Sequence, residues 1–515
     1  MLLVKKYFVS LDYSKMSNDL ASTVPIQKAL TSDMQLGLKT TAPKSRSYNV
    51  SISPSNKSVF IPNDQIIFDI PTGRHGTWLD QSQTYLKLSV QFASTAAVQA
   101  SQTGSITLDN SAYSFIRSFY CYQGSNQLEF IDQYGSLANY LIDHQLSQAD
   151  KAGLSASIGT NPYSNSVTTA ATAGYTQYST VNTTSSPGDR TGLPVTTVAT
   201  ASGIATAVPY IFTLPILSAV VGVNASKMIN LKDLTGTINL QFFLATNDDA
   251  IFYGTTGAGA TWQISNAELV CCFVEIEDDN FNHSDPNIPQ YISGKTYRTA
   301  STTLATGSVG QMDLLVGLRS NSLTQLIARF RNNSTAVQGA DATCAYRLSS
   351  SVSPNLASYY WKINNQLIPQ KPVFLVNGTM GATGGQAFIE LSKSFHAMGS
   401  VLCNGSVTHL MYNVAQANTL GSYPAGKAGF AGPWPVGPSS NGLCNSAYNA
   451  FSIATELEIF SNRTDTILCG INTQNSPLFL SINILTATTA STVCEIYGQM
   501  DVIFVIQHGQ ITPIF

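Results

Sequence analysis

The sequence predicts an all-β protein in which one β-rich unit occurs twice within 515 residues. The first observation is an internal repeat, because Tyr120–Leu128 (YCYQGSNQL) is echoed by Tyr359–Leu367 (YYWKINNQL). The second is that the flanks repeat in the same order, with an alternating stretch before each copy and a helix-like apolar stripe after it. Self-similarity of this kind indicates a duplicated structural unit. Two unrelated β domains that share generic strand and turn patterns are the alternative.

The flanks of the repeat have two distinct periods. Leu86, Leu88, Val90 and Phe92 alternate with polar residues, as in a half-buried strand, and 86–92 aligns with 326–331 of the second copy. Downstream, apolar residues three, four and seven positions apart fit the 3.6-residue period of a helix. These are Tyr134, Leu137 and Leu141 in the first copy and Phe388, Leu391, Phe395 and Met398 in the second.

The first copy is expected to occupy residues 48–277, after an N-terminal arm of residues 1–47. A stretch rich in Ser, Thr, Ala and Gly interrupts it at about 147–209. Because a structureless segment of this length is unusual inside a compact domain, it indicates an exposed excursion from the sandwich. The expected strands are 58–70, 84–92, 116–122, 210–216, 237–244 and 268–276, with a helix near 133–144.

The second copy is expected at 295–515, after a linker of residues 278–294 that contains several acids and two prolines. Its own insertion, rich in Pro and Gly, is expected at about 416–448. The final strands are expected at 451–460, 478–485 and 494–506.

The strand that closes each copy is apolar on both faces. Leu269–Val274 reads LVCCFV, and Val502–Ile506 reads VIFVI. A sandwich strand needs only one apolar face, so both closing strands need cover on their backs. We therefore expect each to lie against the other copy or against a neighbouring chain.

The composition is low in charge and the charge is unevenly placed. Charged residues make up 11% of the chain, against about 25% in ordinary soluble domains. Such a surface has little self-repulsion and permits dense packing beside copies of itself, although secreted β proteins share this composition. The net charge is −3, yet residues 1–46 hold seven Lys or Arg and only three Asp. This basic arm could make weak contact with nucleic acid or with components inside a shell, or it could be merely solvated.

Targeting signals are not evident. Leu2–Val4 is too short for the apolar region of a signal peptide, and Lys5 and Lys6 follow it directly. Met16 could be a later translation start. No apolar run approaches the roughly 18 residues that a membrane helix needs. We expect a soluble protein whose eight cysteines are reduced and mostly buried.

The sequence offers no catalytic, cofactor-binding or metal-ligating residues to nominate. Cys403 and His409 are near each other, but a tetrahedral metal site needs three or four ligands. The glycine-rich stretches 254–259 and 378–385 lack the Gly-Lys-Ser/Thr that cradles phosphate. No pair of carboxylates can be nominated from spacing alone, so we predict that the chain is not an enzyme and has no cofactor.

Several short phrases in both halves resemble those of the double jelly-roll major capsid proteins of polinton-like viruses, virophages and related DNA viruses. The most specific are Pro369–Pro372 (PQKP) and Gly470–Thr473 (GINT). The others are Ile70–Gly73, Leu79–Leu86, Leu214–Ile216, Ile229–Leu234, Ser358–Ile363, Leu457–Glu458 and Pro477–Leu478.

The resemblance implies a definite fold and role. It implies two tandem eight-stranded jelly rolls with short helices and long loop insertions that form an outer tower. It further implies a homotrimer that forms a pseudo-hexagonal capsomer and tiles an icosahedral shell, assembled inside the infected cell and located in the virion capsid. Its partners would be neighbouring capsomers, penton proteins and minor or cement proteins. A β-sandwich adhesin or receptor-binding spike is the main alternative, and a β-sandwich glycosidase with two carboxylates in a cleft is a third possibility.

Overall fold

The computed structural model describes the part of the chain that carries the two predicted copies. The described residues are 44–74, 76–93, 106–160, 194–195, 209–252, 261–277, 288–332, 351, 354, 356–364, 366–375, 385–395, 405, 407, 412, 451–458, 468–485, 487–488 and 491–515. Residues 1–43 of the predicted arm, most of the first insertion and the whole second insertion lie outside them. In the described part, residues at the start of the first insertion form two short helices, α2 (Gln148–Gly153) and α3 (Ser155–Ile158).

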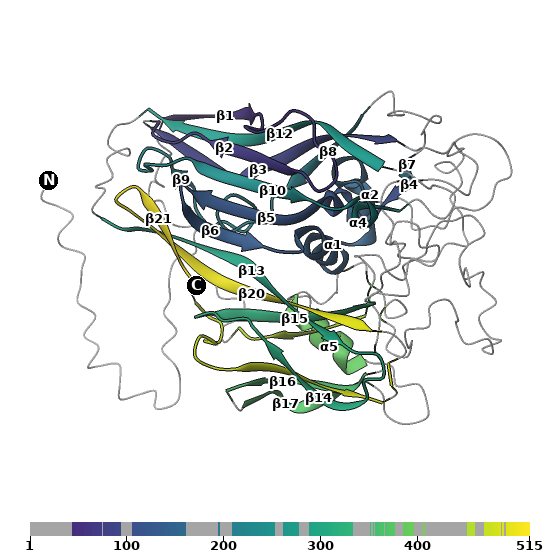
Figure 1. Cartoon of the computed structure of the whole chain (residues 1–515). Helices are drawn as coiled ribbons and strands as arrows, with labels where there is room; N and C mark the ends of the chain where they lie inside the picture. Colours follow the sequence, from purple (N-terminus) through teal and green to yellow (C-terminus); the bar gives the residue numbers. More distant parts are fainter. Residues whose placement is uncertain are drawn as a thin grey trace, which may run out of the picture. The chain divides into compact units, whose positions relative to one another are not determined.

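The first copy consists of two antiparallel sheets packed face to face, each with four strands in its main path (Figure 1), and a short fifth strand pairs beside the path of the first sheet. The chain crosses between the sheets in the order of a jelly roll, and we call this unit roll 1. One sheet has the order β1 (Ser45–Ile52), β12 (Thr261–Ile276), β3 (Thr77–Ala93) and β8 (Tyr210–Pro215). The other has the order β2 (Gln65–Ile70), β10 (Ile238–Leu244), β5 (Ile116–Gln123) and β6 (Asn126–Ile131).

The second copy, roll 2, repeats this strand order. Its first sheet is β13 (Gln290–Leu304), β20 (Thr492–Gln507), β15 (Leu323–Asn332) and β18 (Ser452–Glu456). Its second sheet is β14 (Gly310–Val316), β19 (Leu478–Ile484), β16 (Leu356–Ile363) and β17 (Gln366–Phe374). Each roll therefore has eight main-path strands in the same spatial order, with one short strand beside them, and the chain is a double jelly roll, as predicted.

The sequence repeat coincides with this topology. Tyr120 lies in β5 and Tyr359 in β16, which are equivalent strands of the two rolls. The aligned stretches 86–92 and 326–331 lie in β3 and β15, which are also equivalent. The predicted helices follow in each roll as α1 (Tyr134–Gln145) and α5 (Gly385–Ser394). The repeat in the sequence is therefore the repeat of the fold.

The apolar alternation places the core of each roll between its two sheets. In β10, Ile238, Leu240, Phe242 and Leu244 are buried, and the residues between them are half-buried. Aromatic rings fill the centre of roll 1, where Phe115 lies 4.8 Å from Trp262 and Phe119 lies 5.1 Å from Phe242, measured between ring centroids. Burying such side chains contributes about 1.5–3 kcal/mol each to folding.

Short elements connect the strands. They are β4 (Ile106–Leu108), η2 (Ala112–Phe115), β7 (Pro194–Val195), β9 (Ile229–Asn230), α4 (Asn247–Ala250), β11 (Ile251–Phe252) and β21 (Gln510–Ile514). Strand β21 forms a hairpin with β20 and ends the chain. The helices of the described part include no segment long and apolar enough to span a membrane.

The first strand of each roll begins earlier than the boundaries drawn from the sequence. Strand β1 begins at Ser45, before residue 48, and β13 begins at Gln290, inside the stretch 278–294. Both are edge strands whose outward positions are polar, so neither has the apolar run that marks an interior strand. Arg46, counted above with the arm, is part of β1 and pairs with Glu275 of β12 at 2.5 Å.

The two closing strands, β12 and β20, are buried on both faces over much of their length. In β12, Leu269, Val270, Cys271 and Cys272 are all less than 9% exposed. In β20, the consecutive residues 494–498 are all buried. For β20 the cover is roll 1, since the hydroxyl group of Tyr497 reaches Ser136 in α1. The prediction that a closing strand lies against the other copy is therefore confirmed for β20.

A close backbone approach explains the glycine in the phrase Gly470–Thr473. A Cβ atom at Gly470 would lie 2.4 Å from the carbonyl oxygen of Leu323, at the point where Leu323 and Ile471 exchange two backbone hydrogen bonds of 2.9 Å. Gly470→Ala is expected to lower the free energy of unfolding by about 1–3 kcal/mol, because the backbone of β15 must shift. Gly317→Ala is the control, since a Cβ there meets nothing within 4 Å. Equal denaturation midpoints for the two variants would contradict this explanation.

Candidate functional site

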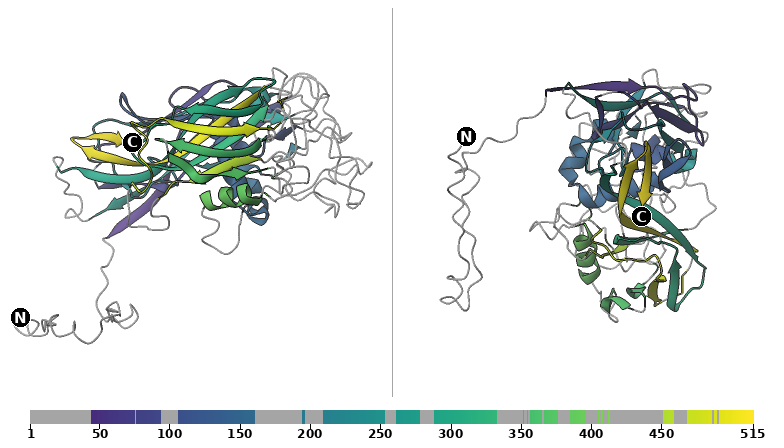
Figure 2. Two further views of the ribbon diagram at one scale, coloured as in Figure 1. Left: turned by 90° about the horizontal axis from the view of Figure 1, so that it is seen from below. Right: turned by 90° about the vertical axis from the view of Figure 1, so that its left-hand side faces the viewer.

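The main candidate site is the interface between the two rolls. We define the sheet face of roll 2 as the outer side of the sheet formed by β13, β20, β15 and β18. We define the helix face of roll 1 as β6 together with α1. These two faces meet, and the side chains that join them are buried. Figures 1 and 2 show α1 of roll 1 next to roll 2, with α5 close beside it.

A charged network lies at the centre of this interface. Glu495 of β20 is 4% exposed and pairs with Arg331 of β15 at 2.9 Å. It also accepts a hydrogen bond of 3.1 Å from the hydroxyl group of Tyr497. Burial alone would raise the pKa of Glu495, but the guanidinium groups of Arg331 and Arg329 hold that pKa below its ordinary value. The network therefore keeps an ionised carboxylate inside the protein.

Arg329 connects this network to roll 1. It is fully buried, and its Nη1 donates a hydrogen bond of 2.7 Å to the hydroxyl oxygen of Ser136 in α1. The hydroxyl group of Tyr497 also reaches Ser136, at 3.3 Å. Buried polar groups of this kind require a definite arrangement, because each one left without a partner costs about 1–3 kcal/mol. The network therefore favours one position of roll 2 on roll 1.

Aromatic and hydroxyl contacts extend the interface along α1. The hydroxyl group of Tyr140 lies 2.7 Å from that of Ser452 in β18. The imidazole ring of His144 stacks on the ring of Phe395, with centroids 5.2 Å apart and planes inclined by 2°. Phe395 directly follows α5, so the two helices that follow the repeated segment in each roll are connected.

A second buried carboxylate lies where β6 meets β13. Glu129 of β6 is 2% exposed and accepts hydrogen bonds from the hydroxyl groups of Thr296, at 2.5 Å, and Ser218. The backbone N–H of Ala219 donates to it as well, at 3.1 Å. Burial raises the pKa of Glu129, and these three donors only partly oppose that effect. The groups that hold Glu129 are thus hydroxyl and backbone N–H donors, in contrast to the guanidinium groups beside Glu495.

The raised pKa of Glu129 predicts a pH dependence. Because the folded protein holds this proton more tightly than the unfolded chain does, stability is expected to fall as the pH rises from about 4.5 through the pKa of the folded state. Glu129→Gln is expected to remove this dependence and to change stability at neutral pH by no more than about 1 kcal/mol. Urea denaturation at a series of pH values measures both effects. If the free energy of unfolding of the variant still falls with rising pH as it does in the unmodified chain, Glu129 is not responsible.

The β20–β21 hairpin fastens the other end of the interface. It reaches across to the β5–β6 turn of roll 1 (Figure 1). The side chain of Gln123 donates to the carbonyl oxygen of Gly509 at 2.7 Å and accepts from the N–H of Ile511 at 2.6 Å. Asn126 donates to the carbonyl oxygen of Ile511 at 2.6 Å. The backbone N–H of Thr235 donates to the Gly509 carbonyl at 3.0 Å.

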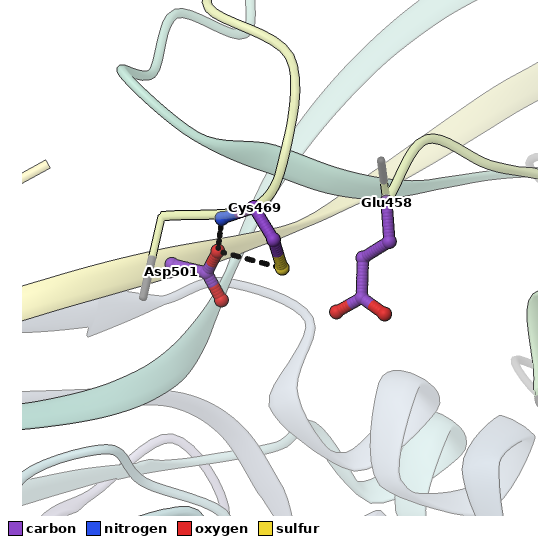
Figure 3. A group of neighbouring side chains, drawn as sticks. All are labelled: Glu458, Cys469 and Asp501. Carbon is purple, nitrogen blue, oxygen red and sulfur yellow. Dashed lines mark hydrogen bonds between the residues drawn. The ribbon is translucent and has the colours of Figure 1, made fainter. Parts of the chain in front are cut away.

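A polar cluster in roll 2 has the composition of a possible metal site. Glu458, Cys469 and Asp501 bring one ligand atom each to within 4.8 Å of one another. Figure 3 shows the sulfur of Cys469 between the two carboxylates. Lys295 already pairs with Glu458 at 2.5 Å, and Asp501 accepts from Ser322 at 2.6 Å and from the N–H of Cys469 at 3.2 Å. Burial, with Asp501 and Glu458 nearby, raises the pKa of Cys469 to about 11, which keeps the thiol protonated.

The residues considered for chemistry in the sequence contribute little to these sites. Cys403, His409 and the glycine-rich stretches 254–259 and 378–385 lie outside the described residues, apart from Gly385 at the start of α5. Cys121, Cys271, Cys272 and Cys494 are buried and free, and burial raises the pKa of each. The sequence pattern did not single out Arg329, Glu495 or Glu129. Each of these three is a charged residue in a largely apolar strand. That pattern points to a buried charge only once the strand is known to be buried.

Comparisons with known proteins bear on the fold. No family model matches the chain, and no curated protein matches its sequence. A chain in the cryo-EM structure of the Sputnik virophage is similar, with a TM-score of 0.55 and 12% identity, covering 96% of this chain and 93% of that one. The Faustovirus major capsid protein gives a TM-score of 0.53 at 9% identity, covering 93% of both chains. A chain of the PBCV-1 virus capsid gives 0.53 at 9%, covering 93% of this chain and 98% of that one.

This chain has the fold of these viral capsid chains. The similarity extends over nearly the whole length of each chain, so it includes both jelly rolls. The resemblance seen in the short sequence phrases is therefore confirmed at the level of the fold. At identities of 9–12%, these chains share the double jelly roll while most of their side chains differ.

Proposed function

We propose that the chain is a major capsid protein, with a structural and not a catalytic role. The observation that carries this proposal is the presence of two complete eight-stranded rolls in one chain, held together by a buried polar interface. The viral capsid chains with the same fold support it. A fixed pair of rolls is a rigid building unit, which suits a protein that must repeat many times in a shell.

The finer part of the proposal concerns assembly. Three chains form a capsomer in which six jelly rolls surround a pseudo-six-fold axis, and these capsomers tile an icosahedral shell in the virion. Closed symmetry limits such an assembly to a defined size. A charged fraction of 11% supports it, because surfaces of low charge can pack closely without strong repulsion.

The proposal also assigns roles to the parts of the chain. Residues 48–277 and 295–515 provide the two rolls, and 278–294 joins them, with the first strand of each roll extending a few residues further toward the N-terminus. The segment 1–47, with its excess of Lys and Arg, contacts nucleic acid or inner shell components weakly. Neighbouring capsomers, penton proteins and minor or cement proteins are the other partners, and assembly takes place in the infected cell.

The purified full chain tests the proposal. Multi-angle light scattering is expected to give the mass of three chains, and cryo-EM is expected to show particles with six similar lobes around one axis. A stable monomer at high protein concentration would argue against a capsomer. Binding of the isolated monomer to glycans or cell surfaces would instead support an adhesin.

A further inference from the structure

A segment of roll 1 closes directly on the first strand of roll 2. We call this segment, residues 216–226 between β8 and β9, the clamp. The backbone N–H of Ser226 donates to the carbonyl oxygen of Ser293 in β13 at 3.2 Å. A Cβ atom at Gly294 would lie 2.9 Å from the Cβ atom of Ala219, so the clamp and β13 are in close contact. The clamp is therefore one of the contacts that join the two rolls.

The clamp is folded around one serine and one carboxylate. The hydroxyl oxygen of Ser218 accepts hydrogen bonds of 3.1 Å from the N–H groups of Val220 and Val221. The hydroxyl group of Ser218 itself donates to the carboxylate of Glu129. The N–H of Ala219 donates to the same carboxylate at 3.1 Å. These four clamp residues are no more than 2% exposed, so the shape of the clamp depends on a buried Glu129.

The carboxylate of Glu129 connects the clamp to both rolls without any cation. It belongs to β6 of roll 1, and it also accepts from the hydroxyl group of Thr296 in β13 at 2.5 Å. Within the part of the chain that the structure describes, no lysine, arginine or histidine forms an ion pair with it. A buried carboxylate without a cation is costly to ionise. A protonated carboxyl group, in contrast, donates to a neighbouring hydroxyl oxygen and still accepts from the N–H of Ala219.

The titratable groups around Glu129 are neutral or have other partners. Cys121 of β5 and Tyr134 of α1 are buried, and burial raises the pKa of both groups, so neither ionises near neutral pH. On β13, Lys295 and Tyr297 pair with polar groups of roll 2. The clamp itself contains no titratable side chain. The charge state of this region therefore depends on the proton of Glu129.

We infer that Glu129 is a proton-sensitive switch for the clamp. With the proton bound, the carboxyl group holds the clamp against β13. When the proton leaves, water must reach the carboxylate, and the clamp moves away from β13 to admit it. The rest of the interface stays closed, because Glu495 is already ionised beside its arginines and the Gln123 bridge contains no titratable group. The opening is local, and the inference does not depend on the proposed capsomer.

Hydrogen exchange of the full chain, followed by mass spectrometry between about pH 5 and pH 8, tests the switch. The rates are first corrected for the intrinsic effect of pH on amide exchange. Peptides that cover the clamp and the first half of β13 are then expected to exchange up to about tenfold faster for each pH unit above the pKa of Glu129, because opening releases one proton. Peptides from β2 and β10 are expected to show no such rise.

Three variants identify the group responsible. Glu129→Gln keeps the size of the side chain and has no proton to lose in this range, so the clamp is expected to stay protected throughout. Glu268→Gln is the matched control, since Glu268 pairs with Lys87 at the surface, and the pH dependence of the clamp is expected to remain. Thr296→Val removes one donor to the ionised carboxylate, so opening is expected to begin at a higher pH.

The possible outcomes separate the switch from its alternatives. If Glu129→Gln retains the pH dependence, another group controls the clamp and the inference fails. The inference also fails if exchange in the clamp is independent of pH, or if it rises in step with exchange in β2 and β10, because the opening is then absent or global. If Glu129→Gln does not fold, Thr296→Val decides, and an unshifted onset of opening overturns the inference. Light scattering of the same samples reports on the proposed capsomer independently.

Discussion

Glu495→Gln is expected to lower the free energy of unfolding by about 3–5 kcal/mol, the largest effect we predict for a single substitution in this chain. The side chain keeps its size, so no cavity forms. The loss comes from charge, because Arg331, whose side chain is only 14% exposed, loses the carboxylate that it contacts at 2.9 Å. Arg329, whose charge also acts on Glu495, loses the same compensation. Chemical denaturation followed by tryptophan fluorescence measures the effect.

The control for this prediction is an ion pair at the surface. Asp64→Asn removes the partner of Lys57, whose side chain is 52% exposed, and surface pairs contribute about 0–1 kcal/mol. A loss of similar size in both variants would show that the inter-roll network has no special importance.

The same carboxylate predicts how stability responds to acid. The pKa of Glu495 is lowered in the folded protein, so its stabilising contribution is complete above the ordinary pKa of about 4.5. The contribution is lost as the pH falls through the lower pKa of the folded state. Glu129 acts in the opposite direction, since its pKa is raised. Glu495→Gln should therefore weaken the fall in the free energy of unfolding as the pH drops below about 4.5. Glu129→Gln should weaken the fall as the pH rises from about 4.5 toward neutral.

Gln123→Ala is expected to lower the free energy of unfolding by about 2–4 kcal/mol, since it removes a buried polar bridge between the rolls. The N–H of Ile511 loses its 2.6 Å acceptor in a place where Gln123 is only 1% exposed. The carbonyl oxygen of Gly509 is less affected, because Thr235 also donates to it. Hydrogen exchange should show faster exchange of the Ile511 amide together with lower global stability.

Gln127→Ala, four residues further along the same turn region, is the matched control. Gln127 is exposed, so its removal is expected to change stability by less than about 0.5 kcal/mol. If both variants behave alike, the β20–β21 hairpin does not hold the rolls together through Gln123.

The sequence was informative where side chains alternate between core and solvent. The aligned stretches 86–92 and 326–331 have this pattern and form equivalent strands, so the duplication could be recognised before any contact was known. It was least informative at edge strands. β1 and β13 each start in polar sequence, and backbone hydrogen bonding to β12 and β20 makes them strands.

By itself, the amino-acid sequence determined that this protein is a duplicated β-sandwich of low charge whose last strands need cover on both sides. The low charge follows from composition. The repeat and the apolar faces follow from the local pattern of side chains, which each strand carries regardless of its neighbours. Only the tertiary structure decided what covers β20, and which charges meet there. Arg329, Glu495 and Ser136 come from three separate elements, and their proximity depends on how two folded rolls pack, which no local pattern encodes.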